Sequence, residues 1–228
     1  MNYKSQRYCV WAGAVFLVML GISMMLLMDY IPPPSPTRTA EEIVAHFHAN
    51  EFEMRFAMWI GLLGSALLLP FSAAQALQMS RVETGRLPVL SVTSFGAGAV
   101  NAMLFILPFI FWSVAFYRHD RNPELIQMAN DVAWLEFVMA YGPYAIQQVT
   151  NGFVGLSDKR SNPVFPRWYC FMCLWFSLMI VPGGFAVLFQ TGPFAWNGLL
   201  AFWIPVGGFS TFVPLQIWVL LRAVRHQE

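Results

Sequence analysis

Long apolar segments alternate with short polar ones along the whole chain, and six of them are long enough to cross the roughly 30 Å hydrocarbon core of a bilayer as α-helices. The last charge-free stretch, Trp168 to Leu221, is too long for one crossing, and Thr191-Gly192-Pro193 divides it. We therefore predict an all-α polytopic integral membrane protein, with one helical-bundle domain over residues 1–228. The predicted spans cover about 8–29, 53–79, 88–116, 130–156, 168–189 and 195–221.

Prolines interrupt most of these spans. Proline has no backbone N–H and kinks or breaks a helix interior, so the sequence predicts proline-kinked spans. Neighbouring helices commonly satisfy the backbone groups that a kink releases, whereas transporters build binding sites from broken helices. The prolines inside five of the six spans are Pro70, Pro108, Pro143, Pro182, and Pro205 with Pro214.

The connection between the first two spans contains its own helix signal. Four prolines between positions 32 and 36 forbid continuation of the first span. Thr39 and Glu42 then have the spacing of a capping box, in which each side chain accepts a hydrogen bond from the backbone N–H of the other residue. We predict a short interfacial helix over about 40–50, leading into the second span.

Basic residues follow a rule that fixes the orientation of membrane proteins, because loops rich in Lys and Arg stay in the cytoplasm. Of the 13 Lys and Arg residues, nine fall in every second gap between spans and four fall in the others. This distribution predicts that both termini are cytoplasmic, in the plasma membrane of a bacterium. The nine residues are Lys4, Arg7, Arg81, Arg86, Lys159, Arg160, Arg167, Arg222 and Arg225; the four are Arg38, Arg55, Arg118 and Arg121.

Composition narrows the class further. The chain is 57% hydrophobic and only 11% charged, with a net charge of +1, so no nucleic-acid partner is expected. The three cysteines fall inside predicted spans, and we interpret Cys170 and Cys173 as small packing residues rather than a redox or metal pair. The chain contains no P-loop, dinucleotide-binding or hydrolase motif, and we predict no cofactor.

One polar stripe is a candidate site. Its side chains lie along the fourth span and, at 100° per residue, fall within an arc of about 80° on one face of the helix. Lipid offers polar side chains no hydrogen-bond partner. The stripe therefore faces the bundle, either as a ligand or proton pathway anchored on Glu136 or as interhelical hydrogen bonding. The stripe comprises Glu136, Ala140, Tyr144, Gln147 and Asn151, and the candidate facing residues are Gln75, Gln78, Asn101 and Gln216.

Small residues recur every four positions at the start of the third span, at Ser94, Gly98 and Ala102. Such spacing lets two helix backbones approach closely in lipid. It predicts a contact face for a homo- or hetero-oligomer.

Imidazoles and carboxylates gather near the predicted outer face, where His46 and His48 are joined by His119, Asp120 and Asp131. These residue types bind zinc. However, residues two apart point about 200° away from each other on a helix, so His46 and His48 do not chelate one ion without distortion. We predict no metal site.

Three functions remain open. The first is binding or translocation of a small, largely apolar molecule within the bundle, in contact with membrane lipid. The second is a non-enzymatic accessory or scaffold subunit that uses the small-residue face. The third is an enzyme on a lipid or terpenoid substrate, with Glu136 as acid or base in an apolar pocket. The predicted ligand contacts are Glu136, Tyr144, Gln147, Asn151, Asn101 and Gln75.

Overall fold

The computed structural model describes residues 3–227, and within that range all regular secondary structure is helical. The elements in chain order are α1 (Tyr3–Gly21), the π-helix η1 (Ile22–Leu27), α2 (Ala40–Ala49), α3 (Glu51–Ala66), α4 (Leu68–Met79), α5 (Val89–Phe116), α6 (Pro123–Met139), α7 (Gly142–Ser157), α8 (Arg167–Met179), the 3₁₀-helix η2 (Val181–Leu188), the π-helix η3 (Leu199–Trp203) and α9 (Ile204–Arg225).

Five helices in the described chain are long and apolar enough to cross a membrane. They correspond to five of the spans predicted from hydropathy, and the all-helical, membrane-spanning class is confirmed to that extent. The five segments are Tyr3–Leu27, Glu51–Met79, Val89–Phe116, Arg167–Leu188 and Leu199–Arg225.

The predicted span 130–156 is not one continuous helix. The structure divides it between α6, of 17 residues, and α7, of 16 residues. Ala140 has a ψ of 42° and leaves the helical region, while Pro143 stands in the first turn of α7. A proline there is tolerated because the first-turn N–H groups have no intrahelical partner, so the helix ends and restarts instead of kinking.

Helix interruptions occur in most of the other long segments as well. The α1 helix widens into η1 at Ile22, α8 tightens into η2 at Val181, and η3 becomes α9 at Ile204. Pro182 and Pro205 each stand at the first or second position of the new helix, as Pro143 does in α7. These prolines therefore mark helix starts, whereas Pro108 and Pro214 lie inside α5 and α9.

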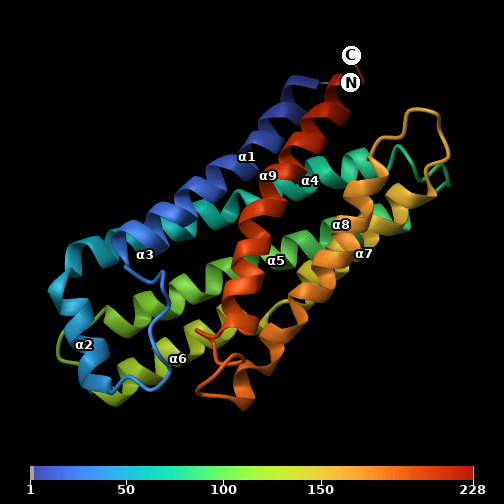
Figure 1. The fold of residues 1–228 in the computed structure, drawn as a ribbon. Helices are drawn as coiled ribbons and strands as arrows, with labels where there is room; N and C mark the ends of the chain where they lie inside the picture. Colours follow the sequence, from blue (N-terminus) through green and yellow to red (C-terminus); the bar gives the residue numbers. More distant parts are fainter. Residues whose placement is uncertain (1–2, 228) are drawn as a thin grey trace.

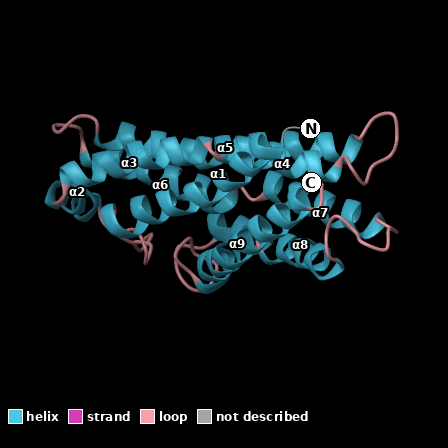
Figure 2. Cartoon of the chain, turned by 90° about the horizontal axis from the view of Figure 1, so that it is seen from above, coloured by secondary structure: helices cyan, strands magenta, loops and turns pink. Residues whose placement is uncertain are grey.

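The helices form an elongated bundle with both chain ends at the same end of it (Figure 1). Seen from above, α8 and α9 lie side by side along one edge, and α3, α4 and α5 follow the opposite edge (Figure 2). Hydrogen bonds join three helices where the termini meet. Gln78 Nε2 donates to Gln6 Oε1 at 2.6 Å, and Arg81 Nη1 donates to the carbonyl of Ala223 at 3.0 Å.

The loop after α7 lies at this end and contains an ion pair between the buried Asp158 and the exposed Arg160. Arg160 donates to the Asp158 carboxylate from Nε at 2.8 Å and from Nη2 at 2.7 Å, and the Val164 N–H donates to it at 2.9 Å. These bonds stabilise the charged carboxylate and lower the pKa of Asp158 to about 2. The loop is thereby held in one conformation around Asp158.

The opposite end is closed by α2 and the segment before it. The capping box expected at Thr39 and Glu42 is present, with Thr39 N–H donating to Glu42 Oε2 at 2.9 Å and Glu42 N–H to Thr39 Oγ1 at 3.3 Å. Trp196 Nε1 donates to the carbonyl of Pro34 at 2.8 Å. The proline-rich segment is thus fixed against the loop that precedes η3.

Candidate functional site

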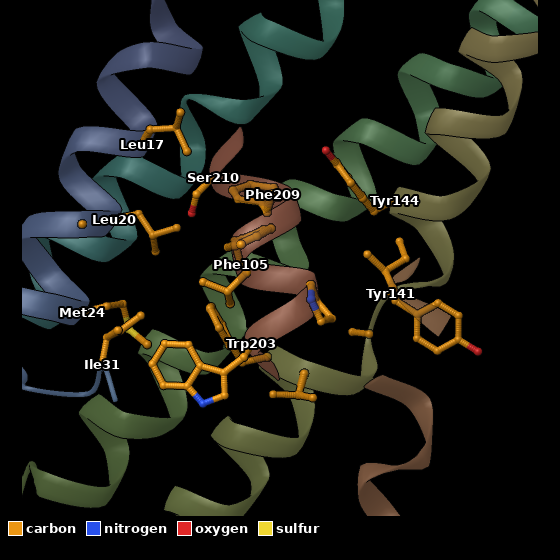
Figure 3. A pocket seen from close by; sticks show the side chains of 18 of the residues that line it. Leu17, Leu20, Met24, Ile31, Phe105, Tyr141, Tyr144, Trp203, Phe209 and Ser210 are labelled. Carbon is orange, nitrogen blue, oxygen red and sulfur yellow. The ribbon is translucent and has the colours of Figure 1, made fainter. Parts of the chain in front are cut away.

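The bundle interior contains two hydrophobic clusters, one toward each end, and a cavity lies where they meet. The cavity has a volume of about 550 Å³, within the range of small-molecule sites. Its wall is mostly apolar and aromatic, and Figure 3 shows Phe105, Phe209 and Trp203 projecting around it. The helix interruptions contribute directly: Gly21, Ala140, Tyr141, Ile180 and Trp203 all line the space.

The cavity is placed by the divergence of α1 and α9. These helices pack together near the termini and separate toward the other end, as Figure 1 shows. Leu17 and Leu20 of α1 line one side, and the α9 segment from Pro205 to Ser210 lines another. Several lining residues are exposed at the molecular surface: Met25 of η1, Trp203 of η3, and Gly207 and Ser210 of α9. The cavity therefore opens sideways, through a surface that is itself apolar.

Asn101 of α5 and Ser210 of α9 bring polar side chains into this wall, and of the two only Asn101 is buried. Its side chain is 4% exposed, and it has no hydrogen-bond partner among residues 3–227. Its amide atoms are not among the fully enclosed unpartnered groups of the described chain, so a molecule in the cavity can reach them. The amide presents both a donor and an acceptor, so it fits a ligand with a hydroxyl or carbonyl group.

Two tyrosines contribute ring surface. Tyr144 of α7 lines the cavity with its ring and packs edge-on against Phe176, at a centroid distance of 5.7 Å. Its hydroxyl is sealed behind the wall and has no partner with hydrogen-bond geometry in the described part of the chain. The Tyr141 hydroxyl points away from the cavity (Figure 3). Both tyrosines therefore serve the site as apolar surface.

Three other predicted site residues lie in an interhelical network next to the cavity, not in its wall. Gln147 Nε2 donates to Ser72 Oγ at 3.1 Å. Ser94 Oγ donates to Asn151 Oδ1 at 3.4 Å, and Gln75 accepts a hydrogen bond from Gln216. Buried amides find partners here across α4, α5, α7 and α9. For these three residues the structure shows interhelical hydrogen bonding, one of the two alternatives that the sequence left open.

Glu136 lies apart from both. It is half-buried on α6 and does not line the cavity. The arc that placed it in line with Tyr144 and Asn151 assumed one continuous helix. Because the chain breaks at Ala140, the 100° increment does not carry from α6 to α7. Of the six predicted ligand contacts, the structure brings only Asn101 and Tyr144 to the cavity.

The face of Ser94, Gly98 and Ala102 is covered by the chain's own helices. All three residues are buried, and a Cβ on Gly98 would lie 2.3 Å from Ser72 Oγ and 2.5 Å from Gln147 Nε2. Close approach of backbones was the right reading of the spacing, but the approaching helices are α4 and α7 of the same chain. These residues are not a free contact face for a partner.

A matched pair of substitutions on α5 tests this packing. Gly98→Ala should lower the free energy of unfolding by about 1–3 kcal/mol, because the new methyl group overlaps two side chains that bond to each other. Gly96→Ala, two residues earlier, adds a methyl group in open space and should raise the free energy of unfolding by about 0.5–1 kcal/mol. Thermal unfolding of both variants in detergent measures the difference. Equal effects would mean that α5 is not packed as described.

The histidines are arranged differently from the sequence expectation. His46 turns inward, with its Nε2 3.0 Å from the carbonyl of Met28. His48 instead lies beside His119 and Glu51, and these three side chains are the group within the described range with metal-ligand spacing.

Cys170 and Cys173 are buried thiols, and Cys170 Sγ donates to the carbonyl of Pro166 at 3.4 Å. The cysteines therefore pack, as predicted.

Sequence reasoning missed most of the cavity wall, because residues such as Phe105, Phe137 and Phe209 are ordinary apolar residues of membrane helices. The prolines were a usable signal in the sequence: Pro143, Pro182 and Pro205 stand at the starts of helices that meet around the cavity. Comparison with protein-family models, with curated proteins and with solved structures finds no match.

Proposed function

We propose that this protein binds a small, lipid-soluble molecule in the cavity between α1, α5 and α9, with Asn101 as the polar contact. The ligand has a largely apolar body and a hydroxyl or carbonyl group that hydrogen-bonds to the Asn101 amide. One observation carries the proposal: Asn101 is buried, lines a largely apolar cavity and has no hydrogen-bond partner in the described chain.

Access from the bilayer follows from the position of the opening. We propose that the chain crosses a bacterial cytoplasmic membrane six times, with α6 and α7 together forming the fourth crossing and both termini cytoplasmic. The support is the segregation of nine basic residues to the gaps at the end of the bundle where the termini lie. The mouth between η1 and η3 then faces acyl chains, from which a lipid-soluble ligand reaches the site without crossing water.

The two alternative functions have less support. Among the cavity-lining residues there is no carboxylate, imidazole, amine or thiol, and Glu136 lies elsewhere, so an acid–base role for Glu136 in this pocket has no geometric basis. A scaffold subunit loses the small-residue face that was its best contact. Translocation stays a prediction alongside binding, because broken helices around a site at mid-depth are typical of transporters.

A cavity-filling substitution tests the proposed function. Gly207 of α9 lines the cavity, and a Cβ there has no atom within 4 Å. Gly207→Leu places an aliphatic side chain in the cavity and should reduce labelling by a photoreactive long-chain alcohol about tenfold or more, because the side chain displaces the probe. Mass spectrometry of the labelled protein in nanodiscs measures the yield and locates the labelled residues.

Gly96→Leu is the matched control, since Gly96 is also a helical glycine with open space around it but does not line the cavity. Its labelling should equal that of the wild type, at residues such as Leu20 and Phe209. Equal labelling of both variants, or labelling confined to the outer lipid-facing surface, would contradict the proposed site.

A further inference from the structure

Three side chains from separate segments meet at the end of the bundle opposite the termini. His48 comes from the end of α2, Glu51 from the start of α3, and His119 from the loop between α5 and α6, which lies beside α2 in Figure 1. One nitrogen or oxygen atom from each lies within 4.8 Å of the other two. His119 Nε2 is 3.1 Å from Glu51 Oε1, and the His48 and His119 rings lie nearly parallel, with centroids 5.8 Å apart.

We propose that His48, Glu51 and His119 bind one zinc ion at this end of the protein. Two imidazoles and one carboxylate are a ligand set that zinc uses, with water in the fourth tetrahedral position. Mg²⁺ and Ca²⁺ prefer oxygen ligands and are not expected to bind here. This site is separate from the cavity and does not depend on the function proposed for it.

His119 belongs to the group of residues considered in the sequence, but the objection to a metal concerned only His46 and His48. His46 and His48 point in different directions, as the helical increment requires, and His46 is occupied by the Met28 carbonyl. The second imidazole comes from His119, 71 positions further along the chain from His48. A ligand contributed by a distant loop has no sequence spacing that would reveal it.

Arg55 is the competitor for this site. Its Nη2 lies 2.8 Å from Glu51 Oε1, and the same atom donates to the carbonyl of Phe116 at 3.2 Å. Without metal, this guanidinium neutralises the Glu51 carboxylate. Zinc has to displace Arg55 from the Glu51 carboxylate and is then repelled by the nearby guanidinium charge. We therefore expect moderate affinity and a metal that exchanges with solution. Arg55→Gln removes the competing cation and should tighten zinc binding several-fold.

Bound zinc would connect the α2–α3 junction to the α5–α6 loop. Both segments are exposed at the end of the bundle, where His119 has a side-chain exposure of 63%. A ligand that binds only the folded state raises its stability in proportion to ligand concentration. Zinc should therefore raise the midpoint of thermal unfolding in a concentration-dependent way.

The test is calorimetric titration of the full-length, tag-free protein in nanodiscs with zinc chloride. We expect one zinc per chain for the wild type and no saturable binding of magnesium chloride. His48→Ala, Glu51→Gln and His119→Ala should each weaken zinc binding by more than the roughly ten- to hundredfold typically lost when a group that only hydrogen-bonds to a metal ligand is removed. His46→Ala is the matched control and should keep the wild-type zinc affinity, because His46 faces Met28.

X-ray absorption at the zinc edge distinguishes this site from binding to the thiols of Cys9, Cys170 or Cys173. The proposed site gives two imidazole nitrogens at about 2.0–2.1 Å and no sulfur, whereas thiolate binding gives sulfur at about 2.3 Å. Sulfur bound to the zinc, absence of zinc binding by the wild type, or wild-type affinity in His48→Ala and His119→Ala would overturn the proposal. Circular dichroism of each variant confirms that the bundle is folded before titration.

Discussion

Replacing Asn101 with leucine should stabilise the protein and weaken its ligand binding at the same time. Leucine has a similar volume, and it removes a buried amide that has no partner within the described chain. We expect the free energy of unfolding to rise by about 1–3 kcal/mol without ligand, the typical cost of an unsatisfied polar group. Binding of the photoreactive alcohol should weaken about ten- to hundredfold, through loss of one or two hydrogen bonds of about 0.5–1.5 kcal/mol each.

Asn151→Leu is the control that gives the result its meaning. Asn151 is equally buried and lies on the neighbouring helix α7, but it accepts a hydrogen bond from Ser94 and donates one to Gln148 at 3.3 Å. Its removal leaves those partners unsatisfied, so stability should fall by about 1–3 kcal/mol while the cavity wall stays unchanged. If the change in the free energy of unfolding is positive for Asn101→Leu and negative for Asn151→Leu, Asn101 is a binding residue and Asn151 a structural one.

Thermal unfolding in detergent and probe competition in nanodiscs provide the two measurements. If Asn101→Leu lowers stability as Asn151→Leu does, Asn101 has a structural partner and the cavity loses its polar contact. If it raises stability but leaves binding unchanged, the ligand is held by apolar contacts alone. Both results contradict the proposed role of Asn101.

The sequence predicted well what depends on hydropathy and local capping. Five of the long helices begin and end within five residues of the predicted spans. The capping box at Thr39 and Glu42 is present as expected. Such signals are local: a cap needs only three or four neighbouring residues, and a span needs only enough consecutive apolar ones.

The predictions that failed concern which side chains face one another in the folded bundle. The polar stripe from Glu136 to Asn151 assumed an unbroken helix, and the two-residue interruption at Ala140 separates Glu136 from the rest. The small-residue stripe at Gly98 was recognised as a packing face, but its partner helix is determined by the tertiary fold. Asn101 was one of six predicted ligand contacts, but the sequence did not set it apart from the other amides, because its lack of a partner is a property of the packed bundle.

The orientation and the number of crossings are testable together, and the broken pair α6–α7 makes this test decisive. A periplasm-active reporter such as alkaline phosphatase is active only when fused at an outer position. If α6 and α7 together cross the membrane, the fourth crossing returns the chain to the cytoplasm at Ser157. If they do not cross, every later position is inverted, so a fusion at Gln190 becomes silent and one at Gln227 becomes active.

We expect the six-crossing pattern, because the gap after α7 contains Lys159, Arg160 and Arg167, three basic residues that favour cytoplasmic retention. This loop also lies at the same end of the bundle as the chain termini, where Arg222 and Arg225 stand in the last turn of α9 (Figure 1). Replacing those three basic residues with glutamine should weaken the retention signal and increase reporter activity at the α7 fusion. An active reporter at Ser157 in the unsubstituted chain would show that α6 and α7 do not form a crossing. The fusions expected to be active follow Met28, Phe116 and Gln190, and those expected to be silent follow Ser80, Ser157 and Gln227.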